Sequence, residues 1–140
     1  MPLDGFPSIC QERAAIIRSK DTGGSQTHIA HNRKSAHVTH YKIDGVVITS
    51  GNKCDFLVIN EDTHVAYLIE LKGSDLCWAA KQLESTKTTL AKQLDGYSVE
   101  YRIVANKCKT QEIESSEFKK YRLKWKRQLV YKTNKLEENI

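Results

Sequence analysis

Hydrophobic and polar positions follow different periods along the chain, and the first part predicts a helix, a loop and a strand region. Residues 9–18 place Ile and Ala at helical spacing behind Ser8, a suitable N-cap, so a short helix is expected. Residues 19–36 are polar and keep no period, which indicates a long loop. From His37 to Thr49 the pattern becomes typical of strands, interrupted by the turn dipeptide Asp44-Gly45.

The second part of the chain has clearer periods. Two apolar strands, 55–60 and 65–72, are separated by the short polar linker 61–64, which predicts a hairpin. A helical stripe of leucine and alanine then runs from Ser74 or Asp75 to Leu94. The remaining elements are a strand at 98–106, a basic helix opened by Ser116 and Glu117, and a short strand at 129–131. The expected fold class is α/β, with a mixed central β-sheet flanked by helices, in a single domain spanning residues 1–140.

Length and composition agree with such a domain. The chain has 140 residues, enough for one hydrophobic core, and its 39% hydrophobic and 28% charged residues exclude a disordered or fibrous class. The longest apolar stretches are a handful of residues, such as 56–59, so no membrane span is expected. The first five residues do not resemble a signal peptide. These features together predict a cytoplasmic protein.

The positive charge is concentrated near the C-terminus. The net charge of +5 favours a polyanionic partner, and six of the ten residues from Phe118 to Arg127 are Lys or Arg. We expect Phe118, Tyr121 and Trp125 to pack on the sheet, because they share one helical face. The outward cations are then either merely solvated or in contact with nucleic-acid phosphates, and we favour the contact. These candidates are Lys119, Lys120, Lys124, Lys126 and Arg127.

Charged residues at the end of an apolar strand indicate a chemical site. Glu70 and Lys72 are two residues apart in a strand, so both side chains leave the same face. If residues 61–64 form the hairpin loop, Asp55 lies directly opposite Glu70, with Cβ atoms about 5 Å apart. Two facing carboxylates repel each other, and a divalent cation between them removes that penalty; oxygen ligands of this kind suit Mg²⁺ or Mn²⁺. The alternative is a surface hairpin that carries a Glu–Lys pair and an unrelated Asp.

These residues resemble the PD-(D/E)xK motif of the restriction-endonuclease-like nuclease superfamily. Asp55 is followed, after fourteen intervening residues, by Glu70-Leu71-Lys72, and Gly73 and a glutamine-bearing helix come next. The resemblance covers roughly residues 9–106 and is to small resolvase-like members, which often act as homodimers. The one departure is Cys54, which stands where the motif's name has proline.

The resemblance implies a restriction-endonuclease-like core and a metal-dependent endonuclease. Asp55 and Glu70, helped by the backbone carbonyl of Leu71, would bind Mg²⁺ or Mn²⁺, which activates water and offsets charge on the phosphate. Lys72 would orient or help to deprotonate the attacking water. The substrate would be DNA, including branched or Holliday-junction-like DNA. The alternative function is a non-catalytic nucleic-acid-binding or protein-interaction domain that retains the nuclease fold.

Two further residues, Glu12 and Gln82, are either part of the site or ordinary polar residues of a helix. Glu12 lies on the predicted first helix, where many relatives carry an additional acidic metal ligand, but the helix dipole alone also favours a carboxylate there. Gln82 would belong to the catalytic group by binding a metal-bound water or a phosphate, or it is simply solvated. Asp44 is more simply a turn residue.

The histidines and cysteines show no strong metal pattern. His28, His31, His37 and His40 form two HxxH pairs, but no cysteines lie at a zinc-like spacing. A flexible loop in which Arg33 and Lys34 touch the nucleic-acid backbone is therefore favoured over a metal cluster. The four cysteines, which include no CxxC pair, are expected to be reduced and structural.

Overall fold

The computed structural model describes residues 3–71 and 73–140 and has a mixed α/β fold with two mixed sheets and few helices. The elements are β1 (Ile16–Lys20), β2 (Thr27–His31), β3 (Val38–Lys42), β4 (Phe56–Asn60), β5 (Val65–Leu71), α1 (Leu76–Thr89), β6 (Ser98–Ala105), α2 (Thr110–Ile113), α3 (Ser116–Trp125), η1 (Lys126–Gln128), β7 (Leu129–Thr133) and β8 (Lys135–Asn139). The larger sheet has the order β3-β4-β5-β6-β7 and the smaller sheet the order β1-β2-β8.

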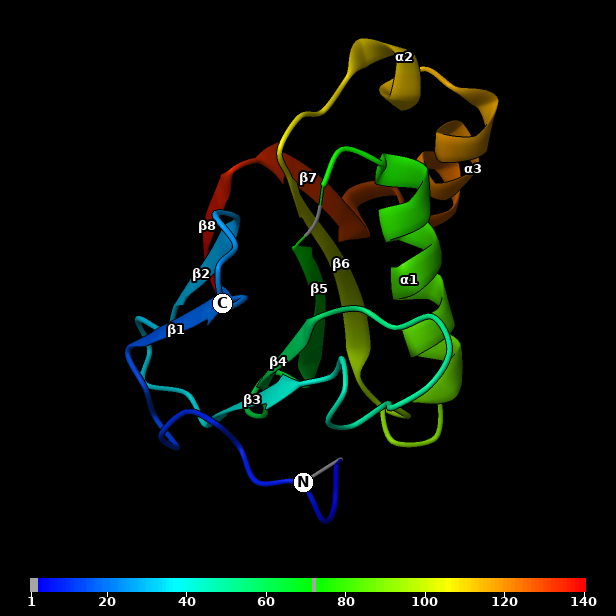
Figure 1. Ribbon diagram of the computed structural model, residues 1–140. Coiled ribbons are helices and arrows are strands. Elements are labelled where there is room, and N and C mark those ends of the chain that lie inside the picture. Colours follow the sequence, from blue (N-terminus) through cyan, green and yellow to red (C-terminus); the bar gives the residue numbers. More distant parts are fainter. Residues whose placement is uncertain (1–2, 72) are drawn as a thin grey trace.

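The larger sheet lies between two different layers. Figure 1 shows α1 and α3 on one face of it and the smaller sheet on the other. The strand β5 pairs with β4 in antiparallel and with β6 in parallel orientation, so it is the middle strand. Its side chains enter two cores in alternation: Leu68 packs on the helical side, whereas Ile69 packs towards the smaller sheet. A strand buried on both faces is continuously apolar, and this one is so until Glu70.

The β4–β5 hairpin and the elements α1, β6, α3 and β7 match the predictions from sequence. The predicted strands 55–60 and 65–72 correspond to β4 and β5, and the predicted strand 98–106 corresponds to β6. The helix α1 has Asp75 as N-cap, whose side chain accepts a hydrogen bond from the Trp78 N–H. All the described helices fall short of the length and apolar character that a membrane span requires.

The predictions for residues 9–36 are wrong. No helix covers residues 9–18; turns precede β1, in which Ile17 and Ser19 are buried while Ile16 is exposed. This period of two suits a strand, and pairing with β2 outweighs the helix propensity of the alanines before it. The predicted loop 19–36 contains β2, which is flanked on both sides by strands. The last strand, β8, was not expected at all.

A buried polar cluster joins the two sheets. The Glu138 carboxylate of β8 accepts hydrogen bonds from Arg102 of β6 at 2.8 and 3.0 Å, and it lies 2.7 Å from Nε2 of His28 in β2. Hydrogen bonds and charge pairing reduce the cost of burying these groups. The histidine pair His28 and His31 therefore lies in a strand, and His28 serves the joint between sheets.

Burial of His40 makes the stability of the fold dependent on pH. His40 lies in β3 with Nε2 2.9 Å from the Ser19 hydroxyl, and burial, assisted by the nearby His28, lowers its pKa from 6.5 to about 4. Between these values the unfolded chain binds a proton that the folded chain does not. Stability from this residue is therefore present above pH 6.5 and is lost as the pH falls towards 4, by up to roughly 3 kcal/mol.

We expect the substitution His40→Gln to remove most of this dependence. Urea unfolding of both proteins at pH 7, 5.5 and 4.5 measures it, since the other titrating groups are common to both. An equal loss of unfolding free energy in the two proteins would show that His40 is not the cause.

Candidate active site

Asp55 is held on three sides immediately before β4. Its backbone N–H donates to the carbonyl of Ile69 at 3.1 Å, and its own carbonyl accepts from the N–H of Ile43 at 2.9 Å. Its carboxylate oxygen Oδ2 accepts from the backbone N–H of Leu71 at 2.8 Å. The side chain is only 3% exposed. Asp55 is thus fixed between the end of β3 and the last residues of β5.

Glu70 lies within this segment of β5. The ladder of β4 and β5 has the predicted register and ends with the pair Phe56 and Ile69. Beyond it, Asp55 contacts residues 69 and 71, one on each side of Glu70, so the hairpin brings the two acidic residues together as expected. Glu70 is 0% exposed and pairs with Ile103 of β6. Since Ile103 belongs to the core on the helical side, Glu70 faces α1 rather than the smaller sheet.

Cys54, the residue at the proline position of the motif, is a neutral neighbour of the two carboxylates. It is completely buried and its thiol lies 3.6 Å from the carbonyl of Phe56. Burial, followed by the charge of Glu70, raises the pKa of this thiol. A buried thiol with a raised pKa stays protonated at neutral pH and is a poor nucleophile. All four cysteines are free, which agrees with the expected reduced state.

Two polar residues of α1 hold the segment that leads to Asp55. The amide oxygen of Gln82 accepts from the N–H of Lys53 at 3.0 Å. One helical turn later, the hydroxyl of Thr86 accepts from the N–H of Cys54 at 2.7 Å and donates to the carbonyl of Gln82 at 2.8 Å. Gln82 therefore contacts the backbone before Asp55 through its oxygen, which is a positioning contact. Thr86 was not predicted, although its i+4 spacing from Gln82 places both on one helical face.

The remaining motif residues lie at the same end of the sheet. Leu71 is the last residue of β5, and its N–H is the one bound by Asp55. Gly73 accepts a hydrogen bond from the N–H of Asn106, which follows β6, at 2.7 Å. Lys72, predicted to be catalytic, lies outside the described residues.

Glu12, Arg33 and Lys34 are not brought to this end. The carbonyl of Glu12 binds the N–H of Val38, the first residue of β3, while Asp55 adjoins the other end of that strand. Residues 9–18 form no helix, so Glu12 does not lie on the predicted helix that would have carried it to the acidic pair. Its carboxylate instead lies 2.7 Å from Nδ1 of His37. Arg33 and Lys34 occupy the turn before β3, where Arg33 donates to Asn139.

Asp44 is a turn residue, as expected. It forms an isolated bridge with Ile48, and its carboxylate lies 3.7 Å from the Lys53 ammonium group. It therefore closes the loop between β3 and β4, the loop that ends at Asp55.

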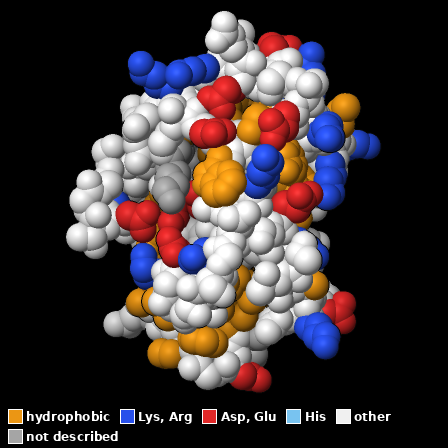
Figure 2. Space-filling model, turned by 45° about the vertical axis from the view of Figure 1, so that its right-hand side comes forward, with side chains coloured by type: hydrophobic (Ala, Val, Ile, Leu, Met, Phe, Trp, Pro, Cys, Tyr) orange, Lys and Arg blue, Asp and Glu red, His pale blue; other side chains and the backbone are white. Residues whose placement is uncertain are grey.

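The aromatic face of α3 packs inward and its cations point outward. Trp125 stacks on Tyr101 of β6 with ring centroids 3.9 Å apart, and Phe118 is fully buried. Lys119, Lys120, Lys124, Lys126 and Arg127 are all exposed. Two of them have acidic neighbours, since Lys119 lies 3.3 Å from Glu114 and Lys124 lies 2.7 Å from Glu84. Figure 2 accordingly shows red and blue side chains mixed on this face rather than one continuous positive surface.

A second acidic group lies at the start of α1. Ligand atoms of Asp75, Cys77 and Glu112 are all within 4.8 Å of one another. Both carboxylates, however, accept backbone hydrogen bonds from the first turn of the helix: Asp75 from Trp78, and Glu112 from Leu76 at 2.6 Å. Capping of α1 accounts for this group without a metal.

We expect Thr86→Val to lower the free energy of unfolding by about 1–3 kcal/mol, because it leaves the buried N–H of Cys54 without its acceptor. Thr88→Val is the matched control: Thr88 is on the same helix and bonds the carbonyl four residues earlier, but it is exposed. Urea unfolding measures both. Equal effects of the two substitutions would contradict the role given to Thr86.

Comparison with known proteins adds no relative: no family model, no curated protein and no solved structure matches the chain.

Proposed function

We propose that this protein is a metal-dependent nuclease with a restriction-endonuclease-like core, which hydrolyses phosphodiester bonds of DNA. The observation that supports this best is that Asp55 binds the backbone of Ile69 and of Leu71, the two residues that flank Glu70 at the end of the middle strand. Two buried acidic residues lie at adjoining positions there, although acidic pairs destabilise a sheet unless their charge is offset. The resemblance to the PD-(D/E)xK motif concerns these same residues.

The donor atoms fit Mg²⁺ or Mn²⁺. Asp55 and Glu70 offer hard oxygen ligands, and a carboxylate has about four acceptor positions, so the bond from Leu71 to Asp55 is compatible with metal binding. A divalent cation at these residues would supply Lewis-acid activation of water and of the scissile phosphate. The thiol of Cys54 does not compete, because soft sulfur ligands suit Zn²⁺ or Cu⁺ rather than these hard cations.

The residues of the chain then have distinct roles. Asp55 and Glu70 hold the cation, with the carbonyl of Leu71 as a third candidate ligand. Gln82 and Thr86 act as positioning residues, because they fix the backbone of Lys53 and Cys54. The role of Lys72, to orient or deprotonate the attacking water, rests on the resemblance alone.

Burial of the acidic pair supports a second candidate, a nucleic-acid-binding domain that does not cleave. Glu70 is 0% and Asp55 3% exposed, and five surface hollows of the described residues are lined by other side chains. A phosphodiester must reach the metal to be cleaved. The two candidates differ in one property, hydrolysis that requires both metal and Glu70.

We expect the purified protein to cleave DNA with Mg²⁺ or Mn²⁺. The substitution Glu70→Gln should reduce the rate by at least about 100-fold, because loss of a metal ligand costs more than loss of a residue that only holds a ligand in place. The assay uses supercoiled plasmid, linear duplex, single strand and a four-way junction, with EDTA as metal-free control. Asp95→Asn, which removes an exposed carboxylate in the turns after α1, controls for charge. Cleavage retained in folded Glu70→Gln would refute the nuclease, and binding without any cleavage by the natural sequence would favour the second candidate.

A further inference from the structure

A basic hollow lies between α3 and β7, separate from the acidic pair. Its volume is about 470 Å³, and it is lined by Lys119, Arg122, Leu123, Lys126, Leu129 and Tyr131. This volume lies within the range of sites that hold small organic ligands. The strand β7 is the outer strand of the larger sheet, so the hollow opens at the edge of the molecule.

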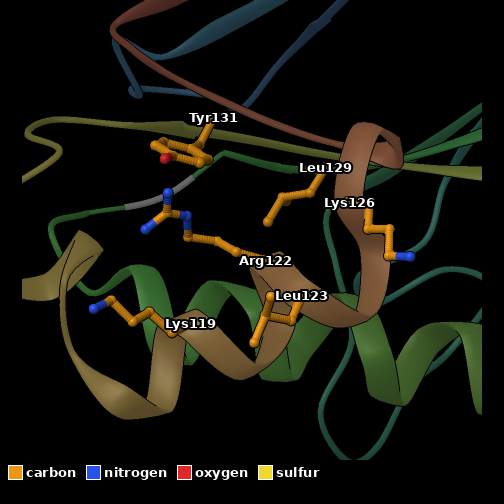
Figure 3. A pocket seen from close by; sticks show the side chains of 6 residues that line it. All are labelled: Lys119, Arg122, Leu123, Lys126, Leu129 and Tyr131. Atoms are coloured by element: carbon orange, nitrogen blue, oxygen red, sulfur yellow. The ribbon is translucent and has the colours of Figure 1, made fainter.

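The cations of the hollow are spread along its length. Figure 3 shows Arg122 reaching from α3 towards Tyr131, while Lys119 and Lys126 point outward at opposite ends. Lys119 and Lys126 are seven residues apart, which at 1.5 Å per residue is roughly 10 Å along a helix axis. One carboxylate, that of Glu114, lies 3.3 Å from Lys119 and 3.7 Å from Arg122. Three cations and one carboxylate leave the hollow positively charged.

The floor of the hollow is aromatic and apolar. The ring of Tyr131 is held edge-on by Phe118 at 5.3 Å between centroids and is only partly buried. Leu123, at the rim, is 74% exposed and therefore offers an apolar contact surface to a ligand in the hollow. A partly exposed ring between cations is the arrangement with which proteins stack bases and hold phosphates of single strands.

We propose that this hollow binds a short unpaired stretch of nucleic acid, with a base against Tyr131 and Leu123 and phosphates on Lys119, Arg122 and Lys126. The roughly 10 Å between the two lysines lets the phosphates of one short stretch of strand reach both side chains. The inference rests on the proposed function for the class of ligand and adds a preference for substrates with a single-stranded part.

The sheet relates the hollow to the acidic pair. Tyr131 pairs with Ile103, which in turn pairs with Glu70, so the three residues form one row on the helical face of the sheet. Two strand spacings, roughly 10 Å, separate the first residue from the last. A strand seated in the hollow is therefore anchored a few nucleotides from the proposed site of cleavage.

The test is fluorescence anisotropy with labelled oligothymidine and a blunt duplex of equal length, in EDTA so that no cleavage occurs. We expect tighter binding of the single strand. Lys126→Gly should weaken it and reduce the slope of log affinity against log salt by about 0.7. Glycine suits this position, because Lys126 has φ 50° after the last turn of α3. Lys120→Ala, which removes an exposed cation of the same helix outside the hollow, should have the smaller effect.

Two further substitutions separate the base contact from the charge. Tyr131→Leu keeps an apolar side chain against Phe118 but removes the aromatic face, and should weaken single-strand binding at least about fivefold. Glu114→Gln should strengthen binding severalfold, because it removes the carboxylate beside Lys119 and Arg122. Thermal melting confirms that each variant is folded.

Preference for the blunt duplex, or equal affinity for a polyglutamate peptide, would overturn the proposal. So would equal effects of Lys126→Gly and Lys120→Ala. No effect of Tyr131→Leu, or unchanged or weaker binding in Glu114→Gln, would overturn it as well. Because binding is measured without metal, this outcome is independent of hydrolysis. If the protein binds single strands in this way but does not cleave them, the result favours the second candidate function and still supports the proposed binding at the hollow.

Discussion

The pairing of β4 with β5 is the constraint on which the rest of the structure depends. Its register places Asp55 beside Glu70, and the bond from the N–H of Leu71 to the carboxylate of Asp55 fixes the end of the hairpin. A shift by one residue would send the side chains of β5 to the opposite faces. Glu70 and Leu68 would then face the smaller sheet, and Leu71 would face the helices. The same pairing therefore determines the core and the acidic pair.

The two faces of the larger sheet use polar residues for different purposes. On the helical side, Gln82 and Thr86 bind backbone groups just before Asp55, so the position of the acidic pair depends on the packing of α1. On the other side, Glu138 joins Arg102 and His28 and ties the smaller sheet to the larger one. These bonds are buried or partly buried, and where the bond is buried a lost partner leaves an unsatisfied group at a cost of about 1–3 kcal/mol. The acidic pair is thus supported by one layer, while the other layer is held by its own cluster.

The elements that could be predicted from the sequence are those with a local cause. The β4–β5 hairpin follows from two apolar runs and a short linker, and its register places Asp55 near Glu70 without further information. The strands β2 and β8 could not be found in this way, because β8 carries only one buried apolar side chain, Leu136, and pairs with a strand more than a hundred residues earlier. The early helix was wrong for the same reason, since pairing between β1 and β2 overrides local propensity.

For the candidate site, too, the sequence predicts features with a local cause and misses those that depend on packing between distant segments. Gln82 was singled out from sequence, but its contact with Lys53 depends on how α1 packs, which no local pattern contains. The expected link between Glu12 and the acidic pair required a helix that does not exist. Arg122 and Tyr131 meet only because α3 folds back on β7, so the charge of the basic helix was visible in the sequence while its aromatic hollow was not.

The proposed catalysis depends on the binding of one divalent cation by Asp55 and Glu70. The most direct measurement is anomalous scattering from crystals of the protein grown with Mn²⁺. We expect a single strong peak with carboxylate oxygens of both residues at about 2.1 Å, and its loss in Glu70→Gln crystals. A folded protein with no peak at these residues, or with its peak at Asp75, Cys77 and Glu112 instead, would show that Asp55 and Glu70 do not form the metal site.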